Sequence, residues 1–226
     1  MKGITMEIEK TESLSDMAYR YILERIISFE YKPNEPIIEN DICVALGISR
    51  TPLREAIRRL EAEGFIVKAR NRGAFVRTYT VEDISESCDI RCLFEVYSLK
   101  NCIAHINKWE IEEVKTNLLR LTVDSSEKEY YGADKGLHGM ITKYCLNARM
   151  LNILKSLSVQ LDMFQRISAQ TPNRLLESKQ EHLKIIEAIE KKDLSQAEEC
   201  LQVHLQNVKI SSIQAFQKMR IEKIGV

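Results

Sequence analysis

Hydrophobic residues recur at three- and four-residue spacing along most of the chain, which is the pattern of amphipathic helices. The pattern predicts three helices in the first third of the chain, which cover 15–29, 38–46 and a stretch capped by Ser49 or Thr51 and stopped by Gly64. Two β-prone runs follow, FIVKA and AFV, joined by RNRG with a glycine where a hairpin turns. Together these elements predict a winged helix-turn-helix.

From about residue 80 onward the helical periodicity is almost continuous. Its interruptions predict six helices, at 82–106, 108–126, 129–147, 149–169, 173–191 and 194–219. Six helices of this length predict a compact bundle. Thr80 followed by Asp83 is a helix N-cap signature at the point where the composition changes. We therefore predict a mainly α protein with one domain over 1–79 and a second over 80–226.

The bulk composition fits a two-domain globular protein of 226 residues, 44% of them hydrophobic. The chain lacks a run of 18 apolar residues, which argues against a membrane span, and its charged start lacks the apolar core of a secretion signal. Six scattered cysteines without a CxxC pair indicate reduced thiols in a cytoplasmic protein. Cys88 and Cys92 are four residues apart, so a shared metal is an open alternative.

The zero net charge of the chain hides a basic segment. Residues 50–77 carry eight Lys/Arg and three acids, a local net charge of +5. Arg50, Arg54 and Arg58 stand at i, i+4 and i+8, which places them on one ridge of the third helix, away from its apolar stripe. Such a ridge is either a solvated helix face, interspersed with Glu55, Glu61 and Glu63, or a surface that binds DNA.

The elements around the ridge favour DNA. Arginine donates hydrogen bonds to guanine in the major groove or binds phosphate. The N-terminal residues of a recognition helix lie deepest in the groove. Ser49 and Thr51 at the helix start offer hydroxyl and backbone N–H groups to phosphate. The short preceding helix, the Gly47 turn and the RNRG hairpin complete the arrangement that a DNA-reading helix needs.

The segment ENDICVALGISRTPLREAIRRLEAEGFIVKARNRGAFV resembles the signature of the GntR superfamily of bacterial transcription regulators, over about residues 13–77. The resemblance implies DNA-facing positions at Arg50, Thr51, Pro52 and Arg54, and a wing tip that enters the minor groove at Arg72 and Gly73. One departure lies upstream, where Pro33-Asn34 replaces the usual Pro-Gly. Because asparagine tolerates positive φ, we expect the turn to survive.

Three of the four histidines have positions that suggest a metal site. Asp134 and His138 are four residues apart and share a helix face, while His182 and His204 fall on the apolar stripes of two later helices. A lone histidine on an apolar stripe is usually a hydrogen-bonded core residue. Three that converge with an aspartate would form a His₃Asp site for zinc, nickel or another divalent transition metal. Spacing alone leaves both interpretations open.

A second resemblance bears on this choice. Asp134-x-x-x-His138, then Glu181-His182, then His204-Leu205 resemble the FCD ligand-binding domain of the FadR branch of GntR regulators. In metal-binding members, the aspartate and three histidines at these motif positions hold a divalent ion, and all four match here. Two departures are Gly136 and Leu137, where the pattern prefers a helix former and phenylalanine. His105 matches nothing in the motif and is expected at a surface or helix end.

The same resemblance suggests where an effector binds. Arg91 and Glu95 have the spacing of the family's R-x-x-x-E, which is either an i,i+4 surface pair or an arginine that points into a cavity to pair with an effector carboxylate. Asn147, at an N-x-x-L junction, is a further candidate lining residue. An arginine that faces a metal suits a small organic acid, such as a simple carboxylate or a sugar acid.

These observations predict a ligand-responsive bacterial transcription regulator that is not an enzyme. We expect a repressor that binds palindromic operator DNA as a homodimer, with an organic acid at or near a divalent metal as the signal. One alternative makes the ion itself the signal. Another is a His₃Asp metalloenzyme, against which the chain lacks an HExxH motif and a nucleophile elbow.

Overall fold

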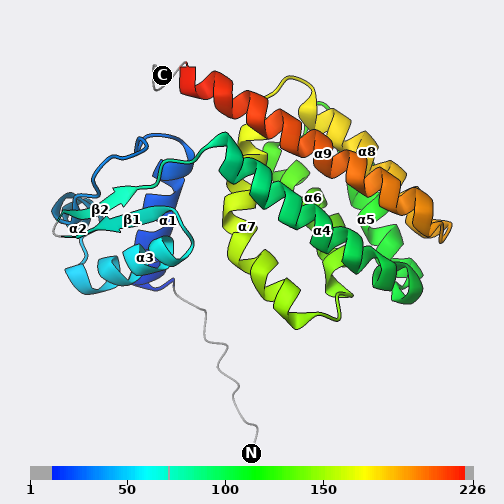
Figure 1. Cartoon of the computed structure of the whole chain (residues 1–226), viewed down its shortest axis with the longest axis horizontal. Coiled ribbons are helices and arrows are strands. Elements are labelled where there is room, and N and C mark those ends of the chain that lie inside the picture. The colour runs from blue at the N-terminus through cyan, green and yellow to red at the C-terminus, as the bar shows by residue number, and fades with distance from the viewer. Residues whose placement is uncertain (1–11, 71, 222–226) are drawn as a thin grey trace, which may run out of the picture. The chain divides into compact units, whose positions relative to one another are not determined.

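The computed structural model describes residues 12–70 and 72–221 (Figure 1). The chain is mainly α-helical, as predicted, and it divides into two compact units between Thr78 and Tyr79. We call these the N-terminal unit and the C-terminal unit. Within the described residues, every helix is too short or too polar to cross a lipid bilayer.

The N-terminal unit is the predicted winged helix-turn-helix. Its elements in chain order are α1 (Leu14–Ile27), α2 (Glu39–Leu46), α3 (Arg50–Ala62), β1 (Ile66–Ala69) and β2 (Gly73–Val76). Helices α1 and α2 both pack against α3, whose buried stripe is Leu53, Ala56, Ile57 and Leu60. The two strands form an antiparallel hairpin in which Ile66 pairs with Val76 and Ala69 with Gly73. Asn71, in the RNRG segment that the sequence predicts to join the two strands, lies outside the described residues.

Two turns position α2 beside α3. Gly47 ends α2 at φ 64°, a left-handed conformation that glycine adopts without steric cost. Asn34 also has φ 64°, which confirms that asparagine replaces glycine in the upstream turn. The chain then runs beside β2, because Ile37 N–H donates to the carbonyl of Ala74 and Val76 N–H to that of Glu35. Sequence periodicity did not predict this third, strand-like segment, since it is short and rich in proline.

The C-terminal unit is the predicted six-helix bundle. Its helices are α4 (Val81–His105), α5 (Lys108–Arg120), α6 (Glu127–Lys143), α7 (Ala148–Ser168), α8 (Arg174–Glu190) and α9 (Leu194–Met219). The predicted Thr80–Asp83 signature is a complete capping box at the start of α4. Helix α4 packs against α6, α7 and α9, and α8 packs against α5, α6 and α9 (Figure 1).

The core of this unit consists mainly of aliphatic residues from five of its helices. Leu99, Leu118, Leu137, Ile185 and Ile186 are fully buried in it. Helix α7 contributes differently: its second half is buried, through residues such as Met163 and Phe164, whereas its first half is half-buried or exposed. Residues of α4, α6 and α7 together line a cavity in this unit.

Candidate functional site

The predicted DNA-facing residues form an accessible surface on the N-terminal unit. Pro52 is half-buried, and the others are exposed: Ser49, Arg50, Thr51, Arg54, Arg58, Arg72 and Gly73. Ser49 is the N-cap of α3, but its side chain makes no capping hydrogen bond in the described part of the chain. Helix α3, α2 and the hairpin enclose a cleft of about 220 Å³ that Arg54, Arg58 and Gly73 line together.

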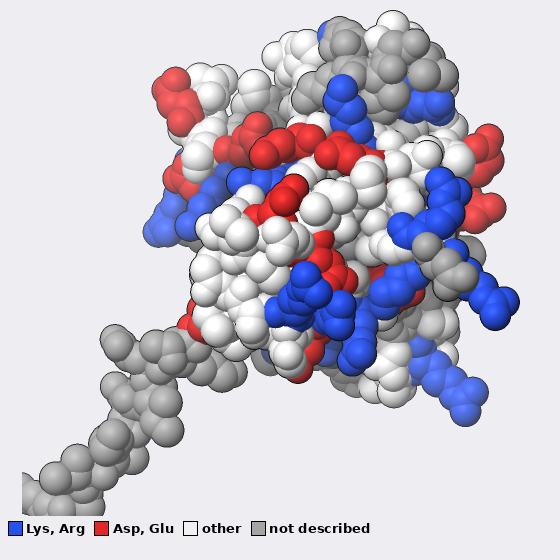
Figure 2. Space-filling model, turned by 90° about the vertical axis from the view of Figure 1, so that its left-hand side faces the viewer, with Lys and Arg blue, Asp and Glu red and all other residues white. Residues whose placement is uncertain are grey.

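The arginine ridge is not neutralised by the acids of its own helix. Glu61 pairs with Lys68, and Glu63 pairs with Arg59, which lies off the ridge. Arg50 and Arg58 have no ion pair among the described residues. In Figure 2, Lys and Arg side chains project from the lower half of this side of the molecule, with acidic side chains between and above them.

One ridge arginine is held by an acid that sequence reasoning did not single out. The Nε–H of Arg54 donates to Oε2 of Glu39, in the first turn of α2, at 3.0 Å. With Nε engaged, the edge formed by the two Nη groups stays available for a pair of parallel hydrogen bonds to a base or a phosphate. Glu39 therefore orients the guanidinium that the sequence places at the centre of the ridge.

The four predicted metal ligands come together inside the C-terminal unit. Asp134 and His138 come from α6, His182 from α8 and His204 from α9, and one potential ligand atom of each lies within 4.8 Å of all the others. All four side chains are buried, with exposed fractions of 5%, 7%, 2% and 0% in that order. Helical spacing explains only the Asp134–His138 pair. The packing of α6, α8 and α9 brings in the other two.

The distances within this cluster fit a shared ion. Oδ1 of Asp134 lies 3.4 Å from Nε2 of His182 and 3.6 Å from Nε2 of His138, and the Nε2 atoms of His182 and His204 are 3.1 Å apart. Ligands at about 2.0–2.2 Å from one ion lie about 3.0–3.6 Å from each other. Asp134 Oδ1 and His138 Nε2 are buried without a hydrogen-bond partner among the described residues. Such orphaned atoms call for an explanation, which a coordinated cation supplies.

A carboxylate fixes the orientation of His138. Nδ1 of His138 lies 2.5 Å from Oε2 of Glu95 on α4, and Oε1 of Glu95 accepts from Nε–H of Arg91 at 2.7 Å. With Nδ1–H donated to the carboxylate, the lone pair of Nε2 faces the centre of the cluster. The sequence left open whether Arg91 and Glu95 form a surface pair, and the structure shows a buried pair that extends to His138.

A second chain of the same kind holds His204. Nδ1 of His204 lies 2.7 Å from Oε2 of Glu181, which Arg174 grips through both of its Nη groups and Asn207 contacts through Nδ2. Arg174 is buried, with an exposed fraction of 4%. Each of these two ligand histidines thus has a glutamate behind it and an arginine behind the glutamate. The sequence offered Glu181 only as part of a motif and gave no signal for Arg174.

The electrostatic state of the cluster suits metal ligation, which needs neutral imidazoles and ionised carboxylates. Burial lowers the pKa of His182 well below its ordinary value and lowers that of His204 to about 4. Burial alone would raise the pKa of Glu95, but the neighbouring His138 and Arg91 bring it down to about 2. In Asp134, the nearby histidines and Arg91 likewise outweigh burial and lower the pKa.

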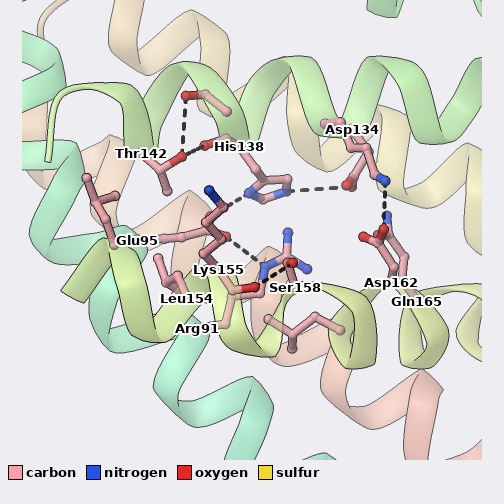
Figure 3. A pocket seen from close by; sticks show the side chains of 14 residues that line it. Arg91, Glu95, Asp134, His138, Thr142, Leu154, Lys155, Ser158, Asp162 and Gln165 are labelled. Carbon is pink, nitrogen blue, oxygen red and sulfur yellow. Dashed lines mark hydrogen bonds and ion pairs between the residues drawn. The ribbon is translucent and has the colours of Figure 1, made fainter. Parts of the chain in front are cut away.

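A cavity of about 510 Å³ opens beside the cluster (Figure 3). Arg91, Glu95, Asp134 and His138 line it from α4 and α6, and Leu154 is among the residues that line it from α7. Arg91 therefore faces the cavity while its Nε binds Glu95. Of the two sequence interpretations of Arg91, the surface pair does not hold, because the Arg91–Glu95 pair is buried, whereas Arg91 does line a cavity.

Four other predicted or considered residues are not part of the cluster. Asn147 is the N-cap of α7, where its Oδ1 accepts from the N–H groups of Arg149 and Met150, and it is not among the described residues that line the cavity. His105 is exposed at the last position of α4, as expected. Cys88 and Cys92 are free thiols on α4, and burial raises the pKa of both.

Comparison with known families assigns both units. The model of the FCD domain matches residues 86–207, and the model described as bacterial regulatory proteins, gntR family, matches residues 14–76. The HTH-type transcriptional repressor RspR of Escherichia coli K12 is 22% identical over 211 residues, which cover 91% of each chain.

Solved structures show the same fold. E. coli McbR/YncC has a TM-score of 0.69 at 18% identity and covers 92% of this chain and 99% of its own. The Zn²⁺-bound FCD domain of TM0439 has a TM-score of 0.55 at 22% identity and covers 62% of this chain and 99% of its own.

Proposed function

Because the chain belongs to the gntR family of bacterial regulatory proteins and carries an FCD domain, we propose that it is a repressor whose operator binding is controlled by an organic acid. This is a family of transcription regulators and not of enzymes. We further propose that it acts in the cytoplasm, binds a palindromic operator as a homodimer, and changes its affinity for DNA when the acid occupies the FCD cavity.

The exposed arginine ridge supports the DNA-binding part. Arg50, Arg54 and Arg58 point away from the buried stripe of α3, and Ser49 and Thr51 at its start offer hydroxyl and N–H groups to phosphate. In this proposal Arg54 reads a base with the edge that Glu39 leaves available, while the other two arginines bind base or phosphate. Arg72 and Gly73 enter the minor groove from the hairpin.

The buried cluster supports the metal part. Asp134, His138, His182 and His204 would hold a divalent transition metal, and their nitrogen-rich set favours zinc or nickel. When bound, such an ion supplies a positive centre with an open position for a carboxylate oxygen. The protein prepares this position by fixing two imidazoles through Glu95 and Glu181.

Charge balance at the cluster supports an anionic effector. Arg91 and Arg174 offset Glu95 and Glu181, so among the described residues of the cluster Asp134 carries the remaining charge when the histidines are neutral. A divalent cation leaves a single positive charge in a buried region, and one carboxylate neutralises it. Arg91 lines the cavity, and in this proposal its Nη groups receive the second oxygen of that carboxylate.

The buried His₃Asp cluster open to a cavity is the observation that carries the effector proposal. A thermal-shift screen of carboxylates and sugar acids with the full chain, with and without EDTA, tests it. We expect stabilisation that disappears when the metal is chelated. Stabilisation by an acid that survives chelation would contradict a role for the metal in effector binding.

The DNA part has its own test. Arg54→Ala is expected to abolish operator binding in a mobility-shift assay, with an operator selected from random DNA by the native protein, and to leave metal content unchanged. Arg120→Ala removes the same charge from an exposed position at the end of α5 and serves as the control. Equal operator affinity in Arg54→Ala and Arg120→Ala would refute the assignment.

A second function is favoured by the way the cluster is built. Glu95 and Glu181 orient His138 and His204 through contacts of the protein alone, so the site is formed for an ion whether or not an acid binds. If binding of the ion alone changes operator affinity, the metal itself is the signal. Chelation would then change operator affinity in buffer that contains no organic acid, whereas an acid-controlled repressor would keep its affinity.

A further inference from the structure

The cavity beside the cluster has walls of different character. Its α4 and α6 side presents Arg91, Asp134 and His138, whereas its α7 side presents Leu151, Leu154 and Leu161. Leu161 is buried, and the other two leucines are half-buried. Figure 3 shows Leu154 and Ser158 on the α7 ribbon, across from His138 on α6.

Most polar groups near the leucines already have partners. The hydroxyl of Thr142 donates to the carbonyl of His138, and that of Ser158 donates to the carbonyl of Lys155. Lys135 pairs with Asp162 at 2.6 Å, which joins α6 to α7. Besides Lys155 and the side-chain amide of Gln165, a ligand therefore finds few free donors among the described residues of this part of the cavity.

On the α7 side of the cavity, Lys155 is a cation that forms no ion pair with any described residue. Its side chain is exposed, unlike that of Arg91, which is buried. An exposed lysine lays its methylene stem on apolar surface and keeps its ammonium in water, and exposed ion pairs contribute little to binding. Lys155 is thus a weak anchor for a second carboxylate.

We propose that the effector is a monocarboxylate with an apolar chain or ring. Its carboxylate lies at Arg91 and the ligand cluster, and its apolar body packs against Leu151, Leu154 and Leu161. This inference rests on the proposed control by an organic acid and narrows its class. A sugar acid or a dicarboxylate would place hydroxyls or a second charge against the leucines, where burial without a partner is unfavourable.

The size of the cavity agrees with this class. At about 510 Å³ it lies within the range of roughly 300–1,000 Å³ that holds drug-sized ligands. A two- or three-carbon acid would occupy only the end next to Arg91 and leave the three leucines uncovered. An apolar body fills that space.

Calorimetric titration of the zinc-loaded full chain tests the inference with acids of one chemical series. Acetate, butyrate and hexanoate share the carboxylate and differ in chain length, and we expect Kd to fall about fourfold for each added methylene. Adipate has the length of hexanoate with a second carboxylate, and we expect it to bind at least about tenfold more weakly than hexanoate. Gluconate tests the effect of hydroxyl groups along the chain, and 1-hexanol tests an apolar chain without a carboxylate.

Variants locate the apolar contact. Leu154→Asn keeps a side chain of similar size and is expected to remove most of the advantage of hexanoate over acetate, with zinc affinity unchanged. Leu146→Asn, at an exposed position before α7, is the matched control and is expected to behave as the native chain. Lys155→Ala is expected to leave hexanoate binding within about twofold of native.

The outcomes separate this inference from the proposed function. Equal affinity for acetate and hexanoate, or tighter binding of adipate or gluconate than of hexanoate, would overturn the apolar-body class while control by an acid stands. Binding of 1-hexanol as tight as that of hexanoate, or no binding of any acid, would overturn the proposed acid control and this inference with it.

Discussion

Oε2 of Glu95 lies 2.5 Å from Nδ1 of His138, and this contact joins α4 to α6 at the centre of the C-terminal unit. It holds the imidazole so that Nε2 faces Asp134, 3.6 Å away. Glu181 holds His204 in the same way. Two glutamates outside the ligand set therefore determine which nitrogen each of these histidines offers to a metal.

Replacing the first of these glutamates is expected to weaken metal binding. Glu95→Gln keeps the size of the side chain but loses the charge that holds Nδ1–H of His138, so zinc affinity should fall about 10- to 100-fold. Competition with a chromophoric chelator measures it. Glu187→Gln, on an exposed position of α8, should bind zinc as the native chain does. Equal affinities in the two variants would show that Glu95 does not support the ligand.

Removing the metal is expected to destabilise the C-terminal unit. A ligand present at about 100 times its Kd stabilises a fold by about 2.7 kcal/mol, which corresponds to roughly 5–10 °C in Tm for a chain of this size. Differential scanning calorimetry with and without EDTA measures the shift. His182→Ala lacks one ligand, so its Tm should respond less to EDTA. A native Tm that EDTA leaves unchanged would contradict a stabilising metal.

Arg174 is expected to contribute strongly to stability. It is buried and grips both oxygens of Glu181, so Arg174→Ala leaves that carboxylate without its main counter-charge and should cost about 2–3 kcal/mol in the free energy of unfolding. Urea denaturation followed by circular dichroism gives the value. Arg149→Ala, at an exposed position in α7, is the control and should change it by less than about 0.5 kcal/mol.

Two glycine-to-alanine substitutions, one in α6 and one at the end of α2, should change stability in opposite directions. A methyl group added at Gly136 meets nothing within 4 Å, so Gly136→Ala should stabilise the chain by up to about 1 kcal/mol through helix propensity. A methyl group at Gly47 also meets open space, but φ there is +64°, and Gly47→Ala should destabilise by about 1 kcal/mol. The Tm values of the two variants should therefore move in opposite directions.

Glu39 is expected to influence sequence discrimination more than overall DNA affinity. Without its contact to Nε of Arg54, the guanidinium loses its fixed orientation, while the loss of a negative charge favours phosphate binding. Glu39→Gln should therefore bind random DNA at least as tightly as native and lose several-fold in preference for the operator. Glu55→Gln, an exposed acid of α3, controls for charge. A preserved preference in Glu39→Gln would exclude an orienting role.

Local sequence patterns were sufficient for much of this protein. Helical periodicity located the described helices, and it placed Asp134 beside His138, because residues four apart share a helix face whatever the helix packs against. Gly47 marked the end of α2, and Asn34 kept its turn, because positive φ is a property of the residue and its immediate neighbours.

Other assignments needed the packed bundle. Glu95 and His138 are 43 positions apart, and Glu181 and His204 are 23 apart, so only the rotation of each helix about its axis brings them into contact. Arg174 looks in sequence like any arginine at a helix start, yet the fold buries it against Glu181. Asn147 resembled a lining residue, but its amide caps α7, since a helix N-terminus needs an acceptor there.

The sequence by itself determined the order of the elements, the separation of a basic helix in the N-terminal unit from a helical bundle in the C-terminal unit, and the identity of the four ligand candidates. These follow from spacing and motif, which are local. Tertiary structure alone decided that the ligand atoms of α6, α8 and α9 converge within 4.8 Å, and that two Arg–Glu pairs stand behind them. Convergence depends on how whole helices pack, and helix packing is the sum of many distant contacts that no short stretch of sequence specifies.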